Sequence, residues 1–202
     1  IRLGVKPGSW FHQMECFGPV LGIIRAENLE EAIDIQNDSE FGLTGGLQSL
    51  DEREIALWKT KVQVGNAYIN RVITGAIVRR QPFGGWKRSA VGPGAKAGGP
   101  DYLMGFGRWE PAIDADSAPP DVAASDDAWL AAARASDRAA LRDHFRPQDP
   151  TGLAAEINVL RYRPVPVTVR VEDAPVRDVL REAAAASASL RKASSGSWPG
   201  GA

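Results

Sequence analysis

The sequence predicts an α/β fold for the first half of the chain and a smaller, partly helical tail after it. Short apolar runs of strand length alternate with two segments that begin with helix-capping residues, and the composition changes beyond residue 110. Strands separated by helices at this spacing are typical of parallel sheets with right-handed crossover connections. We therefore expect a parallel sheet flanked by helices up to about Met104.

The first expected strand covers residues 20–24, because this continuous apolar run suits a strand that is covered on both faces. A helix is expected to begin after Asn28, since asparagine is a common N-cap and a glutamate three residues later completes a capping box. The apolar residues on one face of this helix are Leu29, Ala32, Ile33 and Ile35. Residues 41–47 are rich in glycine and are expected to form a strand or a turn followed by a strand.

A second helix is expected to begin after Asp51, whose side chain can cap its first turn. The buried face of this helix would consist of Ile55, Trp58 and Val62. Gly65 is the expected C′ residue that ends the helix, because glycine readily adopts the left-handed conformation common at that position. Residues 67–69 are expected to form the next strand.

The composition divides the chain into four expected segments. Residues 1–110 hold the α/β part. Residues 111–127 are rich in alanine, aspartate, serine and proline, which is typical of an exposed linker. Residues 128–193 would start a C-terminal accessory region, and residues 194–202, rich in glycine and serine, would be a disordered tail.

Two helices are expected inside the accessory region. Residues 129–145 are alanine-rich and predict the first of them. Residues 156–170 alternate as a strand does, but two prolines limit them to an edge or extended segment. Pro175 is expected to open the second helix, because proline is tolerated at the first helical position.

The bulk composition is that of an ordinary globular protein, with 44% hydrophobic and 24% charged residues. The formal net charge of −1 gives no electrostatic basis for a nucleic-acid partner, and no apolar run in the sequence is long enough to cross a bilayer. Cys16 is the only cysteine, so we expect a reducing, cytoplasmic location and no disulfide. His12 and His144 lack carboxylates at ligand spacing, so no metal site is expected.

Two short motifs and one longer segment resemble a known enzyme family. E-x-F-G-P at residues 15–19 and P-F-G-G-x-x-x-S at residues 82–89 resemble the C-terminal third of the catalytic half of aldehyde dehydrogenases. The segment G-P-G-x-K-A-G-G-P-x-Y-L at residues 92–103 is similar to L-glutamate γ-semialdehyde (pyrroline-5-carboxylate) dehydrogenases, especially those fused to proline dehydrogenase in bacteria. The resemblance therefore implies the C-terminal part of an aldehyde dehydrogenase catalytic domain. Ala90 departs from the general family pattern, which has glycine after the motif's serine.

The resemblance implies NAD as the cofactor, with FAD only if a proline dehydrogenase domain is present upstream. In the family, the glutamate at the position of Glu15 binds the nicotinamide ribose, and the phenylalanine at the position of Phe17 packs beside the nicotinamide. Main-chain groups at the positions of Gly75 and Ala76 anchor the substrate's α-carboxylate, and the ring at the position of Phe83 packs on its aliphatic chain. From the residues alone, Glu15 as a turn cap and Phe17 as a core residue stay open as alternatives.

No catalytic residue is expected in this chain. The family's catalytic cysteine lies well before E-x-F-G-P, whereas Cys16 occupies the variable position of that motif, so we expect a packed thiol there. The family's oxyanion asparagine and base glutamate also lie upstream. The resemblance therefore implies a C-terminal fragment that has no activity on its own.

For the full-length parent, the resemblance implies a homo-oligomeric enzyme that oxidises L-glutamate γ-semialdehyde to L-glutamate with NAD in proline catabolism. Two alternatives stay open. An aldehyde dehydrogenase for another semialdehyde, such as succinate semialdehyde, would share E-x-F-G-P but lack the segment at residues 92–103. A non-catalytic scaffold or oligomerisation module would lack the nucleophilic cysteine upstream of Ile1.

Overall fold

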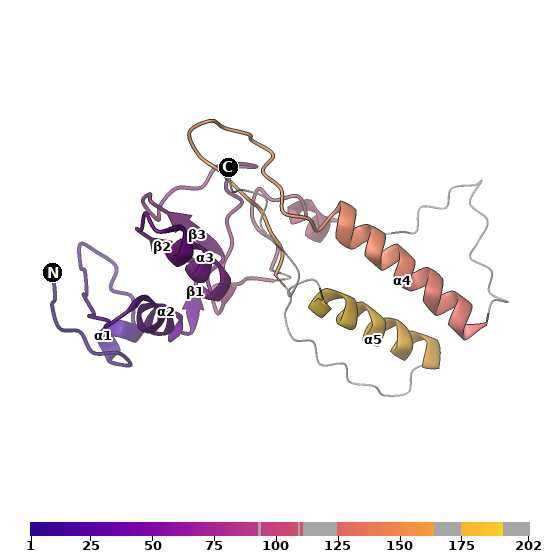
Figure 1. Ribbon diagram of the computed structural model, residues 1–202, viewed down its shortest axis with the longest axis horizontal. Coiled ribbons are helices and arrows are strands. Elements are labelled where there is room, and N and C mark those ends of the chain that lie inside the picture. The colour runs from indigo at the N-terminus through magenta and orange to yellow at the C-terminus, as the bar shows by residue number, and fades with distance from the viewer. Residues whose placement is uncertain (93, 109, 111–124, 164–174, 192–202) are drawn as a thin grey trace. The chain divides into compact units, whose positions relative to one another are not determined.

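A computed structural model describes residues 1–92, 94–108, 110, 125–163 and 175–191 of the chain (Figure 1). The chain divides into two compact units, Ile1–Arg108 and Trp109–Ala202. The division falls close to the expected boundary at residue 110, while the roles expected for residues 111–127 and 128–193 stay predictions. Residues 111–124 and 194–202 lie outside the described residues.

The first unit carries the α/β elements. They are α1 (Trp10–Gln13), α2 (Leu29–Asn37), β1 (Phe41–Gly42), β2 (Thr44–Leu47), α3 (Glu52–Lys61), β3 (Asn66–Ile69), β4 (Trp86–Lys87) and the 3-10 helix η1 (Tyr102–Phe106). β2 and β3 form a parallel pair that runs from Thr44 opposite Asn66 to Leu47 opposite Ile69. This pair confirms the expected parallel strands. β1 and β4 form a separate antiparallel pair, which was not predicted.

α2 begins where the sequence places it, after Asn28. The Asn28 side-chain oxygen accepts a hydrogen bond from the backbone N–H of Glu31 at 2.9 Å. In return, the Glu31 carboxylate accepts from the backbone N–H of Glu27 at 2.6 Å, one residue before the N-cap. The two bonds satisfy donors that a helix N-terminus would otherwise leave unpaired, so the predicted helix start is confirmed.

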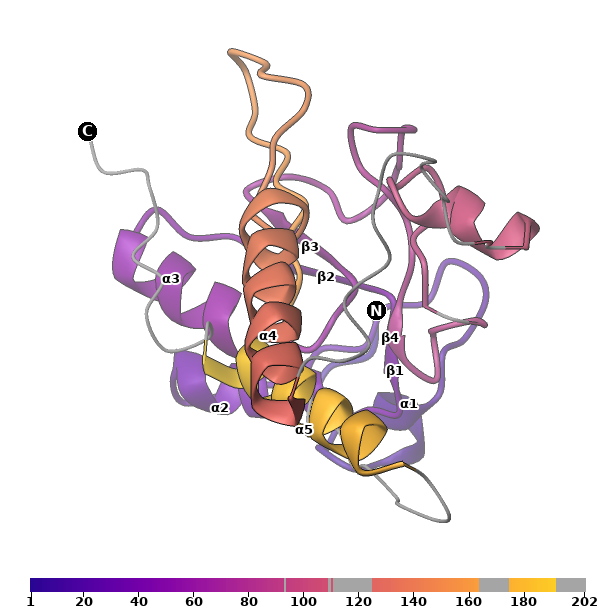
Figure 2. The ribbon, with the colours of Figure 1, turned by 90° about the vertical axis from the view of Figure 1, so that its right-hand side faces the viewer.

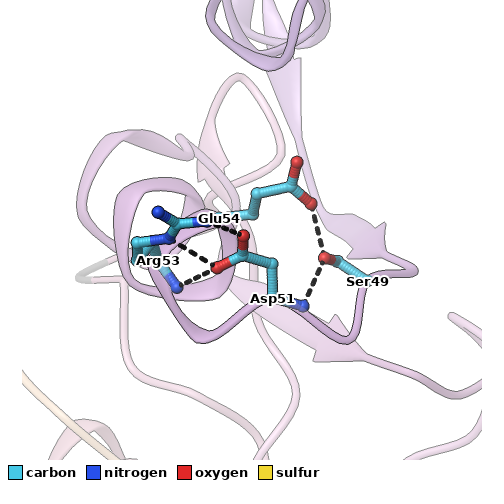
Figure 3. A network of polar contacts seen from close by, with 4 residues as sticks. All are labelled: Ser49, Asp51, Arg53 and Glu54. Carbon is cyan, nitrogen blue, oxygen red and sulfur yellow. Dashed lines mark hydrogen bonds and ion pairs between the residues drawn. The ribbon is translucent and has the colours of Figure 1, made fainter.

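α3 begins after Asp51, in a network of polar side chains (Figure 3). The Asp51 carboxylate accepts from the backbone N–H of Arg53 at 2.8 Å and pairs with the Arg53 guanidinium at 2.7 Å. The hydrogen bond from the Arg53 side chain is the main cause that lowers the pKa of Asp51 to about 2. The Ser49 hydroxyl accepts from the Asp51 backbone and donates to the Glu54 carboxylate. The predicted N-cap is confirmed.

The core of the first unit lies between α2, α3 and the β2–β3 pair. Its fully buried side chains are Ile33 on α2, Trp58 on α3, and Val62 just after α3. The indole N–H of Trp58 donates to the Gln36 side chain on α2 at 2.8 Å, which joins the two helices. Figures 1 and 2 both show these helices next to each other. The apolar faces predicted for both helices therefore point into one core.

The prediction of a strand at residues 20–24 is wrong. A single parallel bridge joins Arg2 and Gly22, and Val20, Leu21 and Ile23 are 50%, 54% and 39% exposed. Arg2 and Val5 supply the backbone partners on one edge of the segment, and the Phe11 ring of α1 lies close to Gly22. The exposed side chains show that the segment is not covered on both faces. An apolar run becomes a doubly covered strand only where layers exist to cover it.

Gly65 does not end α3 as predicted. The helix ends at the C-cap Val62, which has an extended backbone, and Gly65 does not have a positive φ. A Cβ atom at Gly65 would instead lie 1.8 Å from the carbonyl oxygen of Gly84. Glycine is required here because the loop around residue 84 passes directly against the backbone that leads into β3.

The second unit contains two helices that pack against each other, α4 (Asp126–Asp143) and α5 (Val176–Arg191). The Arg181 guanidinium on α5 forms a bidentate ion pair with the Asp137 carboxylate on α4, and both N–O distances are 2.5 Å. These elements confirm the helices predicted at residues 129–145 and after Pro175. α4 starts two residues before the expected accessory region, inside the expected linker.

The segment expected to be extended at residues 156–170 is described only as far as residue 163. Leu160 forms an antiparallel bridge with Gln148, with backbone bonds of 2.9 and 2.8 Å. Residues 164–170 lie outside the described residues. No helix in the described part of the chain has the length and apolarity that a bilayer crossing requires.

Candidate functional site

The E-x-F-G-P turn follows α1 and lines a hollow of about 330 Å³. The residues around this hollow are Phe11, Met14, Glu15, Cys16, Phe17, Gly18, Val20 and Gly22. Phe17 is 94% exposed, so its ring is not part of the core of this chain. The structure therefore places Glu15 and Phe17 on one surface, while their expected contacts with NAD stay a prediction.

His12 anchors this part of the chain to α2. Its Nδ1 accepts from the backbone N–H of Gly8 at 2.9 Å, which leaves the proton on Nε2. Nε2 then donates to the carbonyl oxygen of Ile35 at 2.9 Å. His12 is thus a packing residue, as its lack of nearby carboxylates predicts, and it fixes the helix that precedes the turn.

The chemistry of the turn fits the nicotinamide end of a dinucleotide. Among the described residues, no hydrogen bond or ion pair engages the Glu15 carboxylate, so both oxygens can accept from a ribose diol. The exposed ring of Phe17 offers an apolar face beside it. Turn capping by Glu15 finds no support in the described contacts.

The loop that carries Gly75 and Ala76 is exposed and follows β3. The Tyr68 hydroxyl donates to the Gly75 carbonyl at 3.0 Å, which ties the loop to the strand. Gly75 has a φ of +87°, a backbone conformation that favours glycine. In the described part of the chain, no acceptor takes the N–H of Gly75 or Ala76, so both are available to an anion.

Phe83 lies half-buried on a different part of the same loop. Its backbone exchanges two hydrogen bonds with Ala97, at 2.9 and 2.8 Å. The turn before it is closed by a bond of 2.7 Å from the Gln81 N–H to the Ile77 carbonyl. Phe83 is therefore held by the segment at residues 92–103, the longest of the three sequence features that resemble the family.

Sequence reasoning missed a polar cluster beside Phe83, the Lys96 cluster, which consists of Gly65, Asn66, Pro82, Gly84 and Lys96. The Lys96 ammonium donates to the carbonyls of Gly65 and Gly84, both at 2.7 Å, and to the Asn66 side-chain oxygen at 3.1 Å. Burial lowers the pKa of Lys96 to about 8. The signal available in the sequence was a lysine inside a run of small residues.

The structure does not bring all expected site residues into one pocket. The hollow beside Glu15 and Phe17 contains none of Gly75, Ala76 and Phe83. Cys16 lines that hollow, and among the described residues no general base contacts its thiol.

Comparison with known proteins gives a consistent result. The profile of the aldehyde dehydrogenase family matches residues 1–110. A 1-pyrroline-5-carboxylate dehydrogenase from Staphylococcus haemolyticus is 44% identical over 103 residues, which cover 51% of this chain and 20% of that protein. The chain therefore spans about a fifth of the length of this curated relative.

One solved structure extends the similarity to most of the chain. The structure of proline utilization A from Corynebacterium freiburgense matches this chain with a TM-score of 0.79 and 52% sequence identity. The match covers 93% of this chain and 20% of the proline utilization A chain. The 1-pyrroline-5-carboxylate dehydrogenase from Thermus with bound NAD is 45% identical, with 50% of this chain and 19% of that chain covered and a TM-score of 0.48.

Proposed function

Because the chain belongs to the aldehyde dehydrogenase family, we propose that it is part of an enzyme that oxidises L-glutamate γ-semialdehyde to L-glutamate with NAD, in proline catabolism. The observation that carries this proposal is the similarity to proline utilization A, at 52% identity across 93% of this chain. The curated relative named 1-pyrroline-5-carboxylate dehydrogenase supports the same substrate, since pyrroline-5-carboxylate is the cyclic form of the semialdehyde.

Glu15 and Phe17 would hold the nicotinamide end of NAD. Support comes from the exposed, uncommitted carboxylate of Glu15 and from the open face of the Phe17 ring. When bound, NAD accepts the hydride that leaves the aldehyde carbon. The role of the turn is to orient the nicotinamide and to keep one face of it covered by an apolar ring.

Gly75, Ala76 and Phe83 would bind the substrate away from the aldehyde. Two backbone N–H groups that lack acceptors in the described structure can donate to the α-carboxylate. The ring of Phe83 would pack on the methylene groups between the two ends of the substrate. An anchor for the carboxylate at one end fixes the distance to the aldehyde at the other, which favours glutamate semialdehyde over shorter aldehydes.

No catalytic residue is assigned to this chain. Oxidation through a thiohemiacetal needs a cysteine nucleophile, donors for the oxyanion and a general base for hydrolysis of the thioester. Cys16 lacks a base among the described residues, and the nearby His12 is engaged by Gly8 and Ile35. We place these catalytic groups in the part of the enzyme that this chain does not contain.

We further propose that the full-length enzyme is a cytoplasmic homo-oligomer. The single cysteine is compatible with a reducing compartment, and the oligomer is inferred from the family resemblance.

Replacement of Ala76 by proline in the full-length enzyme tests the substrate assignment. Proline removes one N–H donor and places a ring against the carboxylate. A hydrogen bond to a charged group contributes about 1.5–3 kcal/mol, so kcat/KM for glutamate semialdehyde should fall roughly ten- to a hundredfold. The kcat/KM for propanal, which has no α-carboxylate, should change little, and so should the KM for NAD.

Phe83→Ala is a companion variant that leaves the backbone unaltered and should also lower kcat/KM for glutamate semialdehyde more than for propanal. Steady-state NADH formation measures both variants. If the ratio of kcat/KM for the two aldehydes stayed at the wild-type value in both, the loop would not be the carboxylate anchor. A wild-type enzyme that preferred succinate semialdehyde would contradict the proposed substrate itself.

A further inference from the structure

Lys96 is a half-buried cation whose three N–H donors are all used. Two go to backbone carbonyls, of Gly65 and Gly84, and one to the side chain of Asn66. Burial lowers its pKa, and no carboxylate among the described residues raises it again. Burial of a cation without a counter-ion costs desolvation free energy, so we looked for what the hydrogen bonds of Lys96 stabilise.

The Lys96 cluster holds the backbone on both sides of Phe83. Asn66 donates its side-chain N–H to the Pro82 carbonyl at 3.0 Å and accepts from the Gly84 N–H at 3.1 Å. Lys96 holds the carbonyl of the same Gly84 at 2.7 Å. Residues 82 and 84 are therefore both fixed to side chains, and Phe83 between them is fixed to Ala97, the neighbour of Lys96.

The cluster also joins the loop to the α/β layer. Asn66 is the first residue of β3 and is buried. Gly65, directly before it, accepts from Lys96 and tolerates no side chain because of the Gly84 carbonyl. Loss of the Lys96 ammonium would thus remove its bonds to Gly65, just before β3, and to Gly84, next to Phe83. The loop would then be held less firmly to the strand beside Phe83.

We propose that Lys96 is a positioning residue for substrate recognition, which acts through the Gly84 carbonyl and Asn66 to set the place of the Phe83 ring. The inference rests on the proposed function, because it takes Phe83 as the residue that packs on the substrate's aliphatic chain. Lys96 itself does not touch substrate or cofactor. It determines how well the longer substrate is held and leaves the chemical step unchanged.

The test compares Lys96→Met, Lys96→Arg and the control Lys61→Met in the full-length enzyme. Methionine keeps an unbranched apolar stem but removes the ammonium, whereas arginine keeps a charged donor. Lys61 is an exposed lysine at the end of α3, outside the Lys96 cluster. The measurements are kcat and KM for glutamate semialdehyde and for propanal, together with amide hydrogen exchange at Phe83, Gly84 and Ala97.

For Lys96→Met, we expect the KM for glutamate semialdehyde to rise about tenfold while its kcat stays within about twofold of wild type. The kcat/KM for propanal should stay within about twofold, and exchange at Phe83 and Gly84 should become about tenfold faster. In Lys96→Arg, the KM for glutamate semialdehyde should return close to the wild-type value. Lys61→Met should match wild type in every measurement.

Two results would overturn the inference: an unchanged KM and unchanged exchange in Lys96→Met, or an equal loss for both aldehydes with faster exchange throughout the first unit. The second result would show a general loss of stability. Should Lys96→Met not fold, Lys96→Leu takes its place, because leucine also lacks an N–H donor, and a wild-type KM there would be decisive against the inference. If the wild-type enzyme itself fails to oxidise glutamate semialdehyde, the proposed function fails, and the exchange measurement alone still decides whether Lys96 positions the loop.

Discussion

At the scale of single residues, Gly65 shows how a close backbone contact determines residue type. The contact is invisible in the sequence, because Gly84, the residue that approaches it, lies far along the chain. Sequence reasoning assigned Gly65 to the end of a helix, a common place for glycine, whereas the structure gives it a different reason to be glycine.

Gly65→Ala should destabilise the folded protein by at least about 2 kcal/mol, because the new methyl group would meet the Gly84 carbonyl and force a backbone shift. Gly105→Ala is the matched control, since a Cβ there would have no atom within 4 Å. Urea denaturation measures both variants. Equal midpoints for Gly65→Ala and wild type would show that the loop can move away without cost.

Lys96 predicts a pH dependence of stability. Its pKa is lowered from the ordinary value of 10.5 to about 8 in the folded state, so between these values the unfolded chain holds more protons than the folded one. The free energy of unfolding contributed by Lys96 therefore rises as the pH goes from about 8 to about 10.5, and it is constant below this window.

The measurement is the difference in unfolding free energy between wild type and Lys96→Met at several pH values from 7 to about 10.5, because subtraction cancels the other titrating groups. We expect this difference to shift in favour of wild type across the window. A difference that is independent of pH would mean that the three hydrogen bonds keep the pKa of the ammonium at its ordinary value.

At the scale of elements, the sequence predicted best where the controlling interactions are local. Asn28 and Asp51 were identified as caps because their partners lie within three residues. The strand at residues 20–24 failed because its formation depends on covering layers rather than on its own residues. The Lys96 cluster was missed for a related reason. Its partners include backbone carbonyls, and every residue type has one, so the sequence does not indicate which of them Lys96 contacts.

Loss of the α2 cap provides an element-scale prediction. Asn28→Ala should lower the free energy of unfolding by about 1 kcal/mol, because the N–H of Glu31 loses its acceptor. Asn28→Asp should stay close to wild type, since aspartate caps as well and its charge is favourable at a helix N-terminus. Thermal denaturation of both variants tests this. An Asn28→Ala protein as stable as wild type would show that water replaces the cap without loss.

At the scale of the whole molecule, the residues proposed to bind NAD and substrate lie on two separate parts of the first unit. Glu15 and Phe17 lie on one hollow, and Gly75, Ala76 and Phe83 lie on a separate loop. The similarity to proline utilization A covers 93% of the chain, so it extends beyond the first unit into the helical second one. The similarity therefore covers residues of both units, and this chain spans about a fifth of the length of that solved chain.

The isolated 202-residue chain should therefore show no dehydrogenase activity and should bind NAD weakly. Only the nicotinamide end of NAD would meet Glu15 and Phe17, while contacts to the adenine and pyrophosphate would be missing. Each 1.4 kcal/mol of lost contact weakens binding about tenfold, so the loss of most contacts removes nearly all measurable affinity. Calorimetric titration with NAD and an assay of NADH formation from glutamate semialdehyde test this directly. NADH formation by the isolated chain would mean that its own residues, Cys16 first among them, include a nucleophile, and the assignment of catalysis to other parts of the enzyme would have to be abandoned.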